Sequence, residues 1–152
     1  AWKRLALGLA EIQPGHVVLD LAAGTGDFAI RAAKKAIGET VIAADLTWEM
    51  LAAGQFRPGS SEVNWLQCDA TQLPFADESV DRVLVGYGLR NFPDLDWCLG
   101  EVLRCLAPGG KLVSLDFGRA EPDWLDRWYL RYLDSIASGI LISSWLNGEA
   151  IC

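Results

Sequence analysis

The chain has 152 residues, which is the length of one ordinary domain. Lys and Arg number 13 and Asp and Glu number 20, so the formal net charge is −7. An acidic surface repels phosphate groups, and we therefore expect no nucleic-acid partner. Hydrophobic residues make up 51% and charged residues 22% of the chain, which excludes wholesale disorder. Residues 1–152 are expected to form one folded domain with a sizeable core.

The cysteine and histidine content argues against a metal site and against a disulfide framework. The cysteines are Cys68, Cys98, Cys105 and Cys152. No two of them are spaced as C-x-x-C, and His16 is the single histidine. We therefore expect no bound metal and a reducing, cytoplasmic environment. The longest charge-free segment, between residues 134 and 149, is too short to span a bilayer.

Apolar strand-like segments alternate with helical segments along the chain. In chain order we expect a helix over 2–11, a strand over 17–21, a helix over 27–37, a strand over 41–45, a helix capped by Thr47 and ending at 53, strands over 63–67 and 80–85, a helix over 95–106 closed by residues 108–110, a strand over 111–116 and a helix from about 123. This alternation predicts a Rossmann-like α/β fold, a mostly parallel sheet with helices on both faces. Ligands of such sheets bind beyond the carboxyl ends of the strands, so candidate site residues are taken from segments 20–27, 45–50, 68–71, 86–91 and 116–118.

A glycine-rich turn follows the first expected strand, with the sequence Asp20-Leu21-Ala22-Ala23-Gly24-Thr25-Gly26-Asp27. Glycines let the backbone approach a ligand closely, and the next helix presents unpaired N–H groups at its start. Asp45 follows Gly26 by nineteen residues and ends the second strand, where a carboxylate can accept hydrogen bonds from both ribose hydroxyls. The combination indicates a cofactor that contains adenosine. The structural alternative is a tight strand-to-helix turn with a surface Asp.

The choice of cofactor depends on Asp20. Residues 24–29 also fit the dinucleotide pattern G-x-G-x-x-G/A. A carboxylate four residues before Gly24 can hold the ammonium group of a methionine moiety, directly or through water. The same carboxylate would repel a pyrophosphate. The sequence therefore favours S-adenosylmethionine over a nicotinamide dinucleotide.

Four segments resemble known methyltransferases. Residues 18–27 look like motif I of the class I enzymes, and residues 106–112 look like their turn before the fifth strand. Residues 68–77, together with 86–94 and 115–117, resemble the C-methyltransferases of ubiquinone and menaquinone biosynthesis, which include the demethylmenaquinone methyltransferases. The Gly88-Leu89-Arg90-Asn91 segment is the most specific of these features, since generic methyltransferases lack it. The resemblance covers about residues 2–135.

The resemblance implies an enzyme that transfers a methyl group from S-adenosylmethionine to a ring carbon of a demethylated prenyl quinol, as in demethylmenaquinol to menaquinol. It also implies a seven-stranded sheet and an N-terminal lid with a Tyr-Asp pair. Only five strands are expected here, so we expect a truncated core that lacks the lid and the last strands. The alternatives are another small-molecule class I methyltransferase, a nicotinamide-binding oxidoreductase domain and a non-catalytic binding fragment. The choice between naphthoquinone and benzoquinone stays open.

The resemblance assigns residues to the cofactor. Gly24, Thr25 and Gly26 line its methionine and ribose, and Asp45 holds the ribose hydroxyls. Met50 either packs on the adenine or belongs to the core.

Two further strand ends complete the expected cofactor site. Asp69 and Ala70 meet the adenine edge, where the carboxylate of Asp69 can accept a hydrogen bond from the exocyclic amine. The alternative role for Asp69 is to cap the following turn. Gly86 borders the methionine end, where its small size leaves room for the transferred methyl group.

The expected catalytic residues are Tyr87, Arg90, Asn91 and Asp116. Methylation requires a quinolate whose charge is stabilised away from water, and the permanent charge of Arg90 suits that task. Asn91 can donate a hydrogen bond to the second ring oxygen, while Tyr87 and Asp116 are candidates to relay the proton. The alternative for Arg90 is a surface ion pair with the acidic residue at position 94 or 96.

The last expected helix carries a broad apolar stripe over residues 124–141. This stripe either packs against further strands or forms a groove for the prenyl tail and touches the membrane. A peripheral contact with the inner face of the membrane is therefore one expectation for the lipid-soluble substrate. A homodimer is a further possibility that the sequence leaves open. Residues 144–152 do not match the family pattern.

Overall fold

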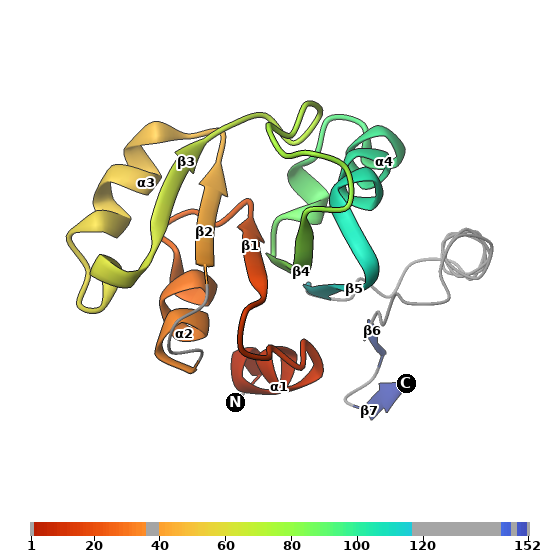
Figure 1. Ribbon diagram of the computed structural model, residues 1–152, viewed down its shortest axis with the longest axis horizontal. Helices are drawn as coiled ribbons and strands as arrows, with labels where there is room; N and C mark the ends of the chain where they lie inside the picture. Colours follow the sequence, from red (N-terminus) through yellow and green to blue (C-terminus); the bar gives the residue numbers. More distant parts are fainter. Residues whose placement is uncertain (1, 36–39, 117–143, 147–148, 152) are drawn as a thin grey trace.

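The computed structural model describes residues 2–35, 40–116, 144–146 and 149–151 (Figure 1). Its main sheet has five strands: β1 Val17–Leu21, β2 Thr40–Asp45, β3 Asn64–Gln67, β4 Val80–Gly86 and β5 Leu106–Leu115. The strands lie in the order β3-β2-β1-β4-β5, and every neighbouring pair is parallel. The helices are α1 Trp2–Leu9, α2 Asp27–Lys35, α3 Trp48–Gln55 and α4 Leu95–Cys105, with short 3-10 helices η1 Ser60–Glu62 and η2 Leu89–Asn91. The predicted Rossmann-like fold is confirmed.

Both faces of the sheet are covered because alternate residues of each strand point to opposite sides. On β1, Val18 belongs to the cluster that contains the buried residues of α1 and α2. Leu19 and Leu21 belong to the cluster that contains the buried residues of α4. Asp20 lies on the same face of the sheet as Val18 and faces α2. The central strand is therefore buried on both faces, as its apolar sequence predicts.

The chain order of the strands creates a switch point between β1 and β4. From β1 the chain runs outward to β2 and β3 on one side, and then crosses to β4 and β5 on the other side. Figure 1 shows the connection from β3 to β4, residues 68–79, passing across the sheet to α4. In open sheets of this kind the ligand crevice lies at the carboxyl ends of the two strands that flank the switch point.

The boundary between α4 and β5 differs from the prediction. Residues 108–110 were expected to close the helix, but α4 ends at Cys105 and β5 begins directly at Leu106. Leu106 pairs with Val80 and Lys111 pairs with Arg82, so residues 107–110 form an irregularity within the strand. Gly109 has a φ of +77°, a left-handed conformation that glycine adopts without strain. The Pro-Gly-Gly sequence therefore marks a bulge inside β5.

The C-terminal part adds a feature that was not predicted. Strands β6, Ser144–Leu146, and β7, Glu149–Ile151, form a separate two-stranded antiparallel sheet. The expected helix from about residue 123 and the end of the segment 116–118 lie outside the described residues. Within the ranges that the structure describes, no helix is long and apolar enough to cross a membrane.

Candidate functional site

A cavity of about 380 Å³ lies at the carboxyl ends of the strands. Its lining comes from the ends of β1, β2 and β3 and the residues that follow them, from α3, and from the end of η2 and the loop after it: Leu21, Ala22, Gly24, Asp45, Leu46, Thr47, Met50, Cys68, Asp69, Ala70, Asn91, Phe92 and Pro93. The volume lies within the usual range for small-molecule sites. Five of the predicted site residues thus meet in one place: Gly24, Asp45, Asp69, Ala70 and Asn91. Among the described residues, no group of three or more His, Cys, Asp or Glu could hold a metal ion.

The carboxylate of Asp45 joins two of the elements that form the cavity. Its Oδ2 accepts a hydrogen bond of 2.7 Å from the backbone N–H of Gly24, and its Oδ1 accepts one of 2.9 Å from the backbone N–H of Thr47. Each carboxylate oxygen can accept two hydrogen bonds, so both oxygens keep capacity for a ligand hydroxyl. Thr47 occupies the predicted N-cap position of α3, but its side chain makes no capping hydrogen bond. Asp45 supplies the anchoring instead.

Met50 lies over the glycine-rich turn. Gly24 has a φ of +56°, and a Cβ added to it would lie 3.3 Å from Cε of Met50. The side chain of Met50 is 44% exposed and lines the cavity. Of its two predicted roles, the core role is therefore wrong, while packing on an adenine stays a prediction.

Asp69 caps its turn, which is one of its two predicted roles, and also lines the cavity, while its contact with adenine stays a prediction. Its Oδ1 accepts hydrogen bonds of 2.8 Å from the backbone N–H and from the hydroxyl of Thr71, which is the expected cap of the turn. The same side chain lines the cavity beside Ala70. The hydrogen bond from the backbone of Thr71, and then that from its hydroxyl, hold the pKa of Asp69 below its usual range. Asp69 is therefore an anionic acceptor at neutral pH.

Asp20 has the opposite electrostatic environment. Its residue is 1% exposed, and its Oδ2 accepts a hydrogen bond of 2.8 Å from the backbone N–H of Ala29 in α2. Burial raises the pKa of Asp20 to about 7, against the opposing effects of the Ala29 hydrogen bond and the charge of Lys3. Asp20 is not among the residues that line the cavity, whereas Ala22, two residues later, is.

An ionic network that the sequence analysis missed fixes the glycine-rich turn. Arg57 donates to the backbone oxygen of Thr25 at 3.0 Å, to the Thr25 hydroxyl at 3.1 Å and to Asp27 at 3.0 Å. Lys3 of α1 donates to Asp27 at 2.7 Å, and Arg31 does so at 3.0 Å. Burial alone would raise the pKa of Asp27, but these three cations outweigh it and hold that pKa well below the usual range. Arg57 gave no sequence signal, because it lies in a loop 32 residues away from Thr25.

The packing of α2 requires a small residue at Gly86. A Cβ on Gly86 would lie 2.5 Å from Cδ2 and Cε2 of Phe28, far inside van der Waals contact. The ring of Phe28 in α2 therefore occupies the space on that side of Gly86. Whether Gly86 also borders a bound methionine stays a prediction.

The loop after β4 contains Tyr87 in a strained conformation. Tyr87 has a φ of +62° and Ala22, at the end of β1, has a φ of +56°, values that side-chain-bearing residues rarely adopt. The Tyr87 N–H donates to the backbone oxygen of Leu115 at 2.6 Å, and Lys3 Nζ lies 5.7 Å from the Tyr87 ring centroid. Such strain concentrates at functional sites, where the surrounding structure holds it in place.

The expected catalytic residues are only partly brought together. Arg90 Nη1 lies 3.8 Å from Asp116 Oδ1, so the alternative pairing with position 94 or 96 is not observed. Asp94 instead caps α4 by accepting a hydrogen bond from the backbone N–H of Trp97. Asn91 lines the cavity, whereas Tyr87, Arg90 and Asp116 lie outside its lining. The Arg90–Asp116 pair links the ends of β4 and β5 at the same edge of the sheet.

Comparison with known proteins decides the family. The model of the ubiE/COQ5 methyltransferase family matches residues 1–142. The chain belongs to this family. The chain is 43% identical over 118 residues to the demethylmenaquinone methyltransferase of Thermus thermophilus. The aligned residues cover 76% of the chain and 54% of that protein. The chain is 36% identical over 151 residues to the ubiquinone/menaquinone biosynthesis C-methyltransferase UbiE of Haemophilus ducreyi, covering 93% of the chain and 58% of that protein.

Solved structures agree with the fold. The YcgJ protein from Bacillus subtilis matches with a TM-score of 0.72 and 28% identity, over 87% of this chain and 56% of that one. The family member described here spans about half the length of the curated relatives it matches. The predicted methyltransferase class and its quinone-biosynthesis family are confirmed, while the roles of single residues stay predictions.

The packing of Phe28 against Gly86 predicts the effect of a substitution. Gly86→Ala should lower the free energy of unfolding by about 1–3 kcal/mol, because the added methyl group meets the Phe28 ring in a closely packed site. Gly100→Ala is the matched control, since a Cβ at Gly100 of α4 meets nothing within 4 Å. It should raise stability by up to about 1 kcal/mol through helix propensity. Urea unfolding measures both, and equal effects of the two substitutions would contradict the packing argument.

The raised pKa of Asp20 predicts a pH dependence of stability. Between pH 3.8 and about 7 the unfolded chain has lost the Asp20 proton while the folded chain keeps it, so stability is greatest below pH 3.8, falls across this interval and is fully reduced above pH 7. The rise from 3.8 to about 7 corresponds to about 4 kcal/mol. Asp20→Asn has no ionisation, so its unfolding free energy should increase relative to the parent chain by that order between about pH 4 and pH 7.5. Urea unfolding at several pH values gives the difference in unfolding free energy between the two chains. A difference that stays constant across this window would show that Asp20 titrates normally.

Proposed function

We propose that this chain is the S-adenosylmethionine-binding core of an enzyme that methylates a ring carbon of a demethylated prenyl quinol, converting demethylmenaquinol to menaquinol. The observation that carries the proposal is the Asp45 carboxylate, held 2.7 Å from the Gly24 N–H, in the same cavity as Asp69. The names of the Thermus and Haemophilus relatives support the quinol substrate. Since those relatives are about twice as long, the activity is proposed for the whole protein.

The cavity suits the adenosine part of S-adenosylmethionine. Asp45 offers its remaining lone pairs to the two ribose hydroxyls, and Asp69 offers an anionic acceptor to the exocyclic amine of adenine. Ala70 contributes the backbone beside the adenine edge, and Gly24 leaves space below Met50. The carboxylate of Asp20, before the glycine-rich turn, would repel a pyrophosphate there, which disfavours a nicotinamide dinucleotide.

The methionine end is assigned to the glycine-rich turn. Thr25 and Gly26 present backbone close to the start of α2, and Gly86 borders the same region from β4. The buried carboxylate of Asp20 is proposed to hold the ammonium group, directly or through water, which would favour the ionised form of Asp20 when the site is filled. The bound cofactor supplies an electrophilic methyl group on a sulfonium.

The quinol is assigned to the loop after β4. Arg90 is proposed to stabilise the negative charge of the quinolate, and Asn91 to donate to the second ring oxygen. Asp116, already paired with Arg90, would orient the guanidinium and accept or relay the phenolic proton, with Tyr87 as the second candidate for that relay. Because a prenyl tail partitions into lipid, the proposal includes a peripheral contact with the inner face of the membrane.

The cofactor assignment is tested by calorimetric titration of the chain with S-adenosylhomocysteine and, in parallel, with NADH. We expect binding of S-adenosylhomocysteine alone. Asp45→Asn should weaken it by at least about tenfold, since it removes a charged acceptor from the ribose hydroxyls. Glu62→Gln is the control, because Glu62 is an exposed carboxylate in η1 outside the cavity lining. Binding of NADH without S-adenosylhomocysteine would overturn the assignment.

The quinol assignment is tested on the full-length protein that contains this chain. It should methylate demethylmenaquinol, and Arg90→Gln should lower kcat/KM by about a hundredfold, the usual cost of losing a group that stabilises developing negative charge. The affinity for S-adenosylhomocysteine should stay the same in this variant. A full-length protein that binds the cofactor product but methylates no demethylated quinol would refute the substrate while leaving the cofactor assignment intact.

A further inference from the structure

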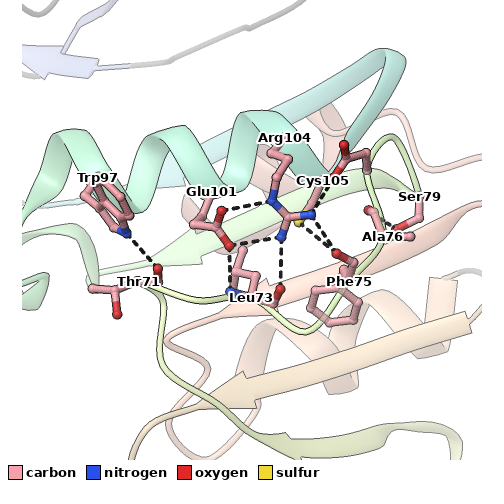
Figure 2. A network of polar contacts seen from close by, with 10 residues as sticks. Thr71, Leu73, Phe75, Ala76, Ser79, Trp97, Glu101, Arg104 and Cys105 are labelled. Atoms are coloured by element: carbon pink, nitrogen blue, oxygen red, sulfur yellow. Dashed lines mark hydrogen bonds and ion pairs between the residues drawn. The ribbon is translucent and has the colours of Figure 1, made fainter.

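The segment that follows the adenine-edge residues Asp69 and Ala70 is attached to α4 (Figure 2). This segment, residues 71–77, contains neither helix nor strand. The indole N–H of Trp97 donates to the backbone oxygen of Thr71 at 2.7 Å. The backbone N–H of Leu73 donates to Oε2 of Glu101 at 2.9 Å. Both bonds join the connection between β3 and β4 to the outer side of one helix.

Arg104 provides the most extensive attachment. Its Nη2 donates to the backbone oxygen of Leu73 at 3.0 Å, and its Nη1 donates to that of Phe75 at 2.8 Å and to the Asp77 carboxylate at 2.7 Å. Glu101 orients the guanidinium by accepting from its Nε at 2.9 Å and from its Nη2 at 3.0 Å. Figure 2 shows the planar group of Arg104 inserted between the helix and the loop. The rigid, planar guanidinium of an arginine presents its N–H donors in a fixed arrangement that matches several acceptors at once. The ammonium of a lysine is a compact charge on a flexible stem and does not offer this arrangement.

A continuous chain of hydrogen bonds runs from α4 to the carboxylate of Asp69. Trp97 holds the backbone oxygen of Thr71. The N–H and the hydroxyl of the same Thr71 both donate to Oδ1 of Asp69 at 2.8 Å. The orientation of the Asp69 carboxylate therefore depends on where Trp97 fixes Thr71.

The same helix is joined to another part of the cavity wall. Asn91, Phe92 and Pro93 line the cavity, and Asp94 follows them directly as the N-cap of α4. α4 thus begins at one part of the wall and holds the loop that leads to another part, Asp69 and Ala70. A single rigid element sets the spacing between the two.

We propose that Trp97 and Arg104 are positioning residues that hold Asp69 at the adenine edge, acting through residues 71–77. The inference rests on the proposed function, in which Asp69 accepts a hydrogen bond from the exocyclic amine. A loop without regular structure would otherwise lose conformational entropy when Asp69 meets its ligand, and the attachment to α4 removes that cost in advance. Trp97 is 64% exposed, so its hydrogen bond to Thr71, more than burial of its ring, accounts for its contact with the loop.

The test compares two ligands that differ only at the adenine edge. S-adenosylhomocysteine carries the exocyclic amine, and S-inosylhomocysteine carries a carbonyl oxygen in its place. The wild-type chain should bind the first more tightly, because the second presents an acceptor to the Asp69 carboxylate. Trp97→Phe keeps an aromatic ring and removes one donor, and Arg104→Lys keeps the charge and removes the fork. Arg4→Lys changes the same chemistry at an exposed position of α1 and serves as control.

The readout is the Kd of S-inosylhomocysteine divided by the Kd of S-adenosylhomocysteine, which measures the preference for the exocyclic amine. Trp97→Phe should reduce this ratio by about fivefold, the factor of one neutral hydrogen bond, with a melting temperature close to that of the wild type. Arg104→Lys should reduce it by about tenfold or more, because several hydrogen bonds are lost together. Arg4→Lys should leave it unchanged.

Two outcomes would overturn the inference. Unchanged ratios in both variants would show that the attachment does not position Asp69. Equal weakening for both ligands would show that Trp97 and Arg104 support the fold in general and not the adenine edge. If the wild type bound neither ligand, the proposed function itself would fail, which is a different result from either of these.

Discussion

The carboxylate of Asp45 is the contact on which the geometry of the cofactor cavity depends. Leu21 pairs with Ala44 across the parallel β1–β2 ladder, so Asp45 falls beside the turn that leaves β1. There it receives the N–H groups of Gly24 and Thr47, which belong to two different elements. Hydrogen bonds to a charged acceptor contribute about 1.5–3 kcal/mol each, more than neutral ones. One side chain thus fixes the glycine-rich turn against the start of α3.

The acidic residues in and near this cavity differ in charge state because their surroundings differ. Asp69 is anionic because Thr71 donates two hydrogen bonds to it, and Asp27 is anionic because Lys3, Arg31 and Arg57 neutralise it. Burial leaves Asp20 with a pKa near neutrality. In the proposed site, an ammonium group held by Asp20 would favour the ionised carboxylate and draw its proton away. If Asp20 holds this group, binding of the cofactor and release of a proton are coupled near neutral pH.

Much of this site was predictable from the sequence, because the relevant signals are local. The glycine-rich turn, Asp45 and Asp69 each follow a short apolar strand, and parallel strands bring their carboxyl ends together. Contacts between distant segments gave no such signal. The sequence predicts only a loop at Arg57. At Arg104 it predicts an ordinary polar position on an amphipathic helix. The size of Gly86 was predictable, but its cause, the ring of Phe28, depends on how α2 packs over the sheet. The start of β5 was also misplaced, since a Pro-Gly-Gly sequence ends a helix as readily as it bulges a strand.

The two halves of the carboxyl edge differ in how firmly they are held. On the cofactor side, Asp45 and Asp69 have short hydrogen bonds to backbone groups that are themselves attached to α3 or α4. On the other side, Arg90 is 57% exposed and its ion pair with Asp116 has a separation of 3.8 Å. An exposed pair of that length contributes little to stability, so its guanidinium can turn toward a new anion at small cost. This contrast fits a reaction in which the donor must be held in a fixed position while the charge on the acceptor ring develops only as the phenolic proton leaves. The firmly held carboxylates of Asp45 and Asp69 therefore match the proposed cofactor side, and the loosely paired guanidinium of Arg90 matches the proposed side where charge changes during the reaction.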